Sequence, residues 1–190
     1  MKILLINNHT KFLDEIISFL PGEVTVCDKD KLDNIEEFKN YNLVVFSGGS
    51  NVPTVMRHPD LYLKEISIIK NTNLPILGIC MGAELISVAF GGTLKDLVNK
   101  LDGEYNINII ENQARNIIGD IVKVFEGHSV GIDYLPKCLE VIASSDNCIE
   151  IFKHREKAIL GLQFHPEIDT NVNLKNWIFN SLIKNNKYNA

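Results

Sequence analysis

Residues 74–82 read Leu74-Pro75-Ile76-Leu77-Gly78-Ile79-Cys80-Met81-Gly82, and this stretch decides the fold. Its first part is short and wholly apolar, which is typical of a strand buried on both faces of a parallel sheet. Residues 83–90 have helical periodicity and end at Gly91-Gly92, so the strand is predicted to turn directly into a helix. Cys80 lies at this sharp turn, where a helix N-terminus favours a thiolate. The sequence therefore places Cys80 where a nucleophile is expected.

A second segment supplies the groups that a nucleophilic cysteine needs. A predicted strand over 159–164 is followed by His165, Pro166 and Glu167. The nucleophile requires a base that takes its proton and a third group that orients the base. His165 and Glu167 fit these roles, and folding can bring them to Cys80 across a long sequence separation. An isolated cysteine after an apolar run is more often an inert packing residue, so this segment decides between the two interpretations.

Strands and helices alternate through the first half of the chain. We predict strands over 3–6, 24–27, 43–46 and 74–79, helices over 12–20, 61–70 and 83–90, and a short helical stretch near 35–38. This alternation predicts an α/β fold of three layers, in which a mostly parallel central sheet carries helices on both faces. The loop at Ser47 and the turn at Cys80 both follow strand ends, where such sheets place their sites.

The second half reads as consecutive strands, which indicate antiparallel additions to the parallel sheet. The predicted strands are 106–110, 121–124, 139–144, 148–154 and 159–164, and a closing helix is predicted over 174–183. Because no linker interrupts the chain, residues 1–190 are expected to form one domain.

Composition narrows the class of protein. The 190 residues are 45% hydrophobic and 23% charged with a net charge of −5, which is neither the composition of a disordered chain nor that of a membrane protein. No basic face suggests nucleic acid as a partner. No apolar run approaches the ~20 residues of a transmembrane helix, and the first apolar run is too short for a signal peptide.

Cysteine spacing gives a further expectation. The four cysteines, Cys27, Cys80, Cys138 and Cys148, have no CxxC spacing, which argues against both a zinc site and a disulfide framework. A reducing, cytoplasmic location is therefore expected.

Three motifs resemble, in order, the signatures of the class I glutamine amidotransferases. The motifs are Ser47-Gly48-Gly49, residues 75–82 and residues 163–167. The resemblance implies the flavodoxin-like fold of that family and a catalytic triad of Cys80, His165 and Glu167. It also implies hydrolysis of L-glutamine to glutamate and ammonia through a cysteinyl thioester, with no metal or organic cofactor.

The resemblance assigns further residues to the site. It implies an oxyanion hole formed by the N–H groups of Gly49 and Met81, with Gly48 in the same loop and in contact with substrate. Glu84 occupies a position that is usually glutamine in the family and that lines the pocket for the amino-acid head group. A carboxylate can accept from the substrate ammonium, whereas the alternative is an ordinary first-turn acid favoured by the helix dipole.

Two segments suggest different relatives within the family. His128 and Ser129 occupy a segment that lines the glutamine pocket and resemble the anthranilate-synthase type. Residues 135–136, 142–146 and 153–154 are instead similar to stand-alone glutaminase subunits of guanylate (GMP) synthase. The chain has no G-x-x-x-x-G-K loop and no room for a synthase domain, so a separate ATP-dependent synthase subunit is expected to receive the ammonia.

Two other functions remain open at this point. One is a free-standing γ-glutamyl hydrolase that uses the same triad, and Glu84 keeps this interpretation open. The other is a non-catalytic regulatory module, which the complete set of triad residues disfavours.

Overall fold

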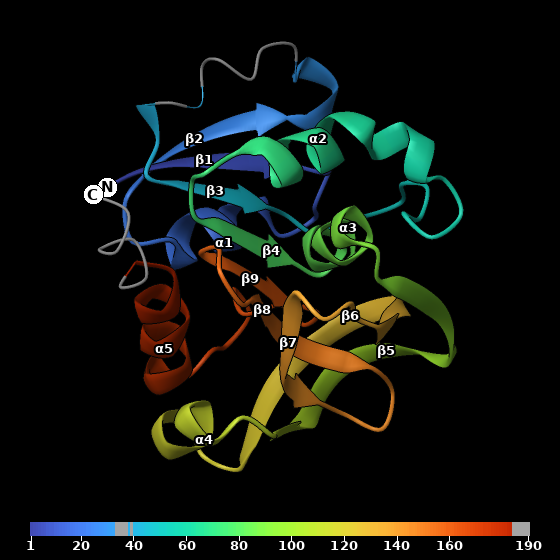
Figure 1. Cartoon of the computed structure of the whole chain (residues 1–190), viewed down its shortest axis with the longest axis vertical. Coiled ribbons are helices and arrows are strands. Elements are labelled where there is room, and N and C mark those ends of the chain that lie inside the picture. The colour runs from blue at the N-terminus through green and yellow to red at the C-terminus, as the bar shows by residue number, and fades with distance from the viewer. Residues whose placement is uncertain (33–37, 39, 184–190) are drawn as a thin grey trace.

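The computed structural model describes residues 1–32, 38 and 40–183 (Figure 1). The helices are α1 (Leu13–Phe19), α2 (Leu63–Asn71), α3 (Met81–Phe90), α4 (Asn112–Ile118) and α5 (Val172–Ile183), with short 3-10 turns at Lys29–Lys31 and Pro59–Tyr62. The strands are β1 (Lys2–Asn7), β2 (Glu23–Asp28), β3 (Leu43–Phe46), β4 (Ile76–Ile79), β5 (Thr93–Ile109), β6 (Ile121–Tyr134), β7 (Leu139–Ser144), β8 (Ile149–His154) and β9 (Ile159–Leu162). The helical stretch predicted near 35–38 lies largely outside the described residues.

The nine described strands form one sheet in the order β2-β1-β3-β4-β9-β8-β6-β5-β7. The first five strands pair in parallel, and the others pair antiparallel. In Figure 1 the parallel strands lie together in one part of the sheet and the long β5 and β6 lie in the other. The prediction of an α/β fold with antiparallel additions in the second half is confirmed.

The apolar strands are explained by two hydrophobic clusters. In β1, Ile3 and Leu5 belong to one cluster, while Leu4 and Ile6 belong to the other. Successive side chains of a strand point to opposite faces, so a strand between two clusters must be apolar throughout. Helices α1 and α5 contribute to the first cluster, and α2 and α3 contribute to the second. None of the helices in the described part of the chain has the length and apolar character needed to cross a membrane.

The antiparallel part is larger than the sequence predicts. Strand β5 has 17 residues and β6 has 14, and they pair from Thr93–Tyr134 to Asn108–Ile121. The predicted strands over 106–110 and 121–124 are only one end of this ribbon. Most β5 side chains are exposed or half-buried, so the sequence lacks the apolar alternation that marks a strand, and pairing with β6 holds it in place.

Helix α4 is absent from the predicted elements because it is only seven residues long. Its N-terminus is fixed by Glu111, whose carboxylate accepts from the N–H groups of Gln113 and Ala114 at 3.0 and 2.7 Å. This capping interaction stabilises a helix that is too short to show a clear periodic pattern.

Close backbone contacts allow the abrupt turn from β4 into α3. A Cβ atom on Gly78 would lie 2.6 Å from the carbonyl oxygen of Gly82. A Cβ atom on Gly82 would overlap the carbonyl oxygen of Phe46 at the end of β3. Glycine is therefore required at both positions for α3 to pack against the ends of β3 and β4.

Replacing Gly82 by alanine is expected to lower the free energy of unfolding by about 1–3 kcal/mol, because the added methyl group must displace main chain. Urea denaturation monitored by circular dichroism measures this loss. Gly91→Asn is the control, since Gly91 has φ of +96° and no heavy atom within 4 Å of its Cβ position. Asparagine tolerates left-handed backbone, so this variant should lose less than about 1 kcal/mol. Equal losses in the two variants would contradict the packing argument.

Candidate active site

The three sequence motifs leave the sheet at the same edge because their strands are neighbours. Strand β4 lies between β3 and β9, and all three are parallel. Phe46 pairs with Gly78, and Ile79 pairs with Leu162. Consequently the loop after β3, the turn after β4 and the segment after β9 adjoin one another.

Cys80 occupies a strained turn at the start of α3. It is not glycine, yet its backbone has φ of 50° and ψ of −109°, and its N–H donates to the carbonyl of Leu162 at 2.7 Å. Such backbone conformations cluster at functional sites. Burial raises the pKa of the Cys80 thiol, the carboxylates of Glu84 and Glu126 raise it further, and a hydrogen bond from the Met81 N–H acts in the opposite direction. The sulfur therefore rests as a thiol that needs a base.

His165 is held by a buried carboxylate and by aromatic rings. Its Nδ1 lies 2.8 Å from Oε1 of Glu167, and both side chains are almost fully buried. The ring of Phe12 contacts the imidazole edge-on, with 5.0 Å between centroids, and the main-chain N–H of His165 donates to the carbonyl of Phe125. Because a carboxylate accepts, Nδ1 carries the proton and Nε2 of the neutral ring is left as the base.

Cys80 and His165 converge on Gly48. A Cβ atom on Gly48 would lie 3.5 Å from Cβ of Cys80 and 3.1 Å from Cε1 of His165. Gly48 thus fills the space beside both residues, and a larger side chain would push the imidazole away. The structure brings together Cys80, His165, Glu167 and the glycine loop, as the sequence predicts.

A cavity of about 510 Å³ opens beside Cys80. This volume suits a small organic molecule. Six of the predicted site residues line it: Gly49, Cys80, Met81, Glu84, His128 and Ser129. The N–H of Gly49 makes no main-chain hydrogen bond within the described residues, so it is available to an atom in the cavity.

Glu84 is a buried wall residue rather than an exposed first-turn acid. Its Oε1 accepts a hydrogen bond from Nε2 of Gln163 at 3.3 Å. Burial raises the pKa of Glu84 to about 7, although the Gln163 hydrogen bond and the charge of His128 oppose this shift. The carboxyl group therefore changes its charge near neutral pH.

His128 forms another part of the wall and is fixed by two hydrogen bonds. Nδ1 lies 2.7 Å from the carbonyl of Val130, and Nε2 lies 2.8 Å from Oε2 of Glu126. Burial lowers the pKa of His128, but the hydrogen bond and charge of Glu126 outweigh this effect and raise it overall. Both ring nitrogens are engaged, so His128 shapes the cavity and is not a second free base.

Comparison with known proteins identifies the family. The family model described as glutamine amidotransferase class-I matches residues 4–185. The chain belongs to the class I glutamine amidotransferases. The match spans all three motifs, so this amidotransferase carries its family signatures on the strand ends described above.

Similar amidotransferases include archaeal proteins named as the glutamine-hydrolysing subunit of GMP synthase. The protein of Methanosphaera stadtmanae is 33% identical over 174 residues, which cover 88% of this chain and 89% of the relative. The protein of Methanococcus vannielii is 31% identical and covers 87% of each chain. The match in Saccharolobus solfataricus is 31% identical and covers 80% of each.

Solved structures agree with this assignment. A crystal structure described as a candidate GMP synthase subunit from Thermoplasma acidophilum is 25% identical, has a TM-score of 0.82 and covers 97% of this chain and 93% of its own. A glutamine amidotransferase from Thermotoga maritima has a TM-score of 0.72 at 22% identity, covering 99% of this chain and 85% of its own, which supports the fold alone.

The amidotransferase cavity also contains residues that the sequence motifs do not mark. Lys11 follows β1, and Lys100 lies in β5; both line the cavity. Gln163 belongs to the third motif, yet its contact with Glu84 becomes evident only in the structure. Lys100 has no detectable signal in the sequence because it reaches the site through the pairing of β5 with β6.

Proposed function

We propose that this amidotransferase is the glutaminase subunit of a GMP synthase. It hydrolyses L-glutamine to glutamate and ammonia and delivers the ammonia to a separate, ATP-dependent synthase subunit. The observation that carries this proposal is the similarity to glutamine-hydrolysing GMP synthase subunits over almost the full length of both chains. The amidotransferase domain is proposed to be one unit of three layers, with α1 and α5 on one face of the sheet and α2 and α3 on the other.

The proposed reaction uses Cys80 as the nucleophile and His165 as the base. Nε2 of His165 takes the thiol proton while sulfur attacks the side-chain carboxamide carbon of glutamine. Glu167 orients the imidazole and stabilises its protonated form. His165 then donates the proton to the departing ammonia, and it activates the water that hydrolyses the glutamyl thioester.

The negative oxygen of each tetrahedral intermediate is proposed to lie between the N–H groups of Gly49 and Met81. The N–H of Met81 is free of intrahelical bonding because Met81 begins α3. The helix N-terminus adds a favourable dipole at the same point. Gly48 keeps the loop close to Cys80 and leaves room for substrate.

The head group of glutamine is proposed to bind the polar wall of the cavity. Ionised Glu84 accepts from the α-ammonium group, and Lys11 and Lys100 attract the α-carboxylate. His128 and Ser129 shape the wall opposite. This arrangement explains why a carboxylate can replace the usual glutamine at position 84.

Glutamine binding should therefore depend on pH through Glu84. As pH rises from about 6 to 8, Glu84 with its pKa of about 7 becomes ionised and the KM for glutamine should fall several-fold. In Glu84→Gln, this pH dependence of KM should disappear, while kcat at pH 8 stays within about tenfold of the original. Steady-state kinetics across this pH range measure both quantities.

The control for this experiment is the pH profile of kcat, which follows His165 in both proteins and should stay parallel. A large loss of kcat with unchanged KM in Glu84→Gln would instead place Glu84 in the chemical steps.

The proposed function is tested by reconstitution with a candidate GMP synthase subunit. Glutamine-dependent GMP formation should require both proteins, and ammonium chloride should replace glutamine and this chain together. If ammonium supports GMP formation but glutamine does not, the proposed role in GMP synthesis is wrong. Efficient hydrolysis of other γ-glutamyl amides by the chain alone would favour the free-standing hydrolase.

A further inference from the structure

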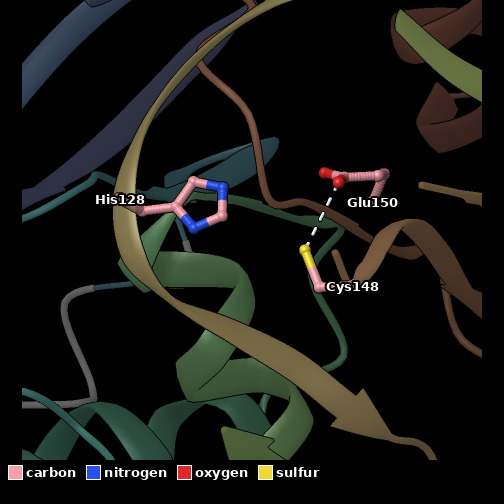
Figure 2. A group of neighbouring side chains, drawn as sticks. All are labelled: His128, Cys148 and Glu150. Carbon is pink, nitrogen blue, oxygen red and sulfur yellow. Dashed lines mark hydrogen bonds between the residues drawn. The ribbon is translucent and has the colours of Figure 1, made fainter. Parts of the chain in front are cut away.

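A second cluster of chemically active side chains adjoins the cavity through His128. The cluster contains His128 on β6, Cys148 just before β8 and Glu150 on β8, and one ligand atom from each lies within 4.8 Å of the others. All three side chains are buried. Figure 2 shows the carboxylate of Glu150 directed toward the ring of His128 and joined by a hydrogen bond to the sulfur of Cys148.

The hydrogen bonds around His128 leave an unbalanced group of acceptors. A carbonyl oxygen only accepts, so Nδ1 of His128 donates to Val130 and Nε2 of the neutral ring carries a lone pair. That lone pair faces the Glu126 carboxylate at 2.8 Å. Two acceptors at this distance require a positive centre, either a proton or a metal ion.

Two buried carboxylates make the need for positive charge stronger. Glu126 and Glu150 are both fully buried, and Oε1 of Glu126 and Oε2 of Glu150 have no partner among the described residues. The other oxygen of Glu150 is shared by Ser145 Oγ at 2.6 Å and Cys148 Sγ at 3.3 Å. One imidazole cannot compensate two buried carboxylates beside a thiol.

We propose that His128, Cys148 and Glu150 bind a zinc ion, with Glu126 next to them as the fourth donor. Nitrogen, sulfur and carboxylate ligands together are typical of Zn²⁺. The 3.3 Å between Cys148 Sγ and Glu150 Oε1 is close to the roughly 3.5 Å between two ligands of a tetrahedral zinc site. The Val130 carbonyl fixes the tautomer that leaves Nε2 for the metal.

The predicted absence of a zinc site rests on the lack of cysteine pairs, and this cluster contains only one cysteine. Its other ligands come from two strands, so no sequence spacing marks the site. Strands β6 and β8 share one register pair, Ile132 with Ile149. A zinc ion at this point would link the two strands and hold the cavity wall formed by residues 127–130.

The metal content of the untagged full chain tests the proposal directly and requires no enzymatic activity. After incubation with zinc chloride and gel filtration, mass spectrometry of elements should find about one zinc per chain. Cys148→Ser and Glu150→Gln should lower the zinc affinity by at least about tenfold. Cys138→Ser is the matched control, because this cysteine lies outside the cluster and should leave zinc binding unchanged.

Cobalt substitution identifies the sulfur ligand. Co²⁺ in place of zinc should give a thiolate-to-cobalt charge-transfer band that is lost in Cys148→Ser and retained in Cys80→Ser. A band lost with Cys80 instead would assign the metal to the nucleophile and overturn the proposal. Zinc content far below one per chain in the original protein would also overturn it.

A chelator experiment covers the case in which the variants fail to fold. The original protein should show a lower melting temperature after treatment with EDTA, and zinc chloride should restore it, since a ligand that binds the folded state stabilises it. An unchanged melting temperature in a protein that has lost its zinc would contradict a structural site between β6 and β8.

Discussion

Replacement of Cys80 by alanine is expected to lower kcat for glutamine hydrolysis by at least about 10³-fold, because no other group in the cavity can form the thioester. Ammonia release under saturating glutamine measures the effect. The matched control is Cys138→Ala, which removes a half-buried thiol away from the site and should retain the original rate. Substantial glutaminase activity in Cys80→Ala would rule out the nucleophile assignment.

Chemical labelling and the two partner residues sharpen this test. A glutamine-like chloroketone should modify Cys80 alone, as mapped by mass spectrometry. His165→Ala should be nearly as damaging as loss of the thiol, since the residues act as a unit. Glu167→Gln should be milder because Glu167 orients the imidazole without carrying the transferred proton.

The second large effect is expected from a partner protein. The chain alone should hydrolyse glutamine slowly, and a GMP synthase subunit should raise kcat on the order of 10²-fold, which is the usual cost of one missing oxyanion donor. The partner achieves this only by binding preferentially to the active loop conformation. Glutamine hydrolysis measured while titrating the synthase subunit gives the activation factor.

The structure identifies a bond that such activation would have to break. The Ser47 hydroxyl donates to the carbonyl of Gly48 at 2.8 Å, and this carbonyl belongs to the same peptide as the N–H of Gly49. In a trans peptide the two groups point in opposite directions, so turning one turns the other. Ser47→Ala should release the peptide and raise the activity of the lone chain several-fold, while the partner-bound rate stays similar.

The outcomes of the Ser47→Ala experiment separate two mechanisms. A parallel fall in both rates would mean that the Gly49 N–H already faces the oxyanion in the free chain and that Ser47 holds it there. High activity of the original chain without any partner would contradict regulated activation altogether.

The parallel half of the fold and the triad geometry were predictable from sequence. Fully apolar strands, short loops and glycine turns each carry a local signal, and parallel neighbours place their carboxyl ends together. Motifs at three strand ends were thus sufficient to bring Cys80, His165 and Glu167 to one edge. The family resemblance supplied the roles that geometry alone does not give.

The antiparallel half was less predictable because its order depends on pairing rather than on local pattern. The solvent-exposed β5 carries Lys100 to the cavity, and only its register with β6 determines that position. Glu126 and Glu150 look like ordinary alternating polar residues of strands in the sequence. Their complete burial follows from the packing of β6, β8 and β9, which no single segment reveals.

The left-handed backbone at Cys80 has a consequence for how this chain can change over time. A non-glycine residue in such a conformation costs on the order of 1–3 kcal/mol of folding free energy, so the nucleophile makes the protein less stable than it could be. Glycine at this position would relieve the strain and abolish the chemistry. Selection for stability alone would therefore drive the chain toward an inactive descendant, and the cysteine persists only while hydrolysis is required.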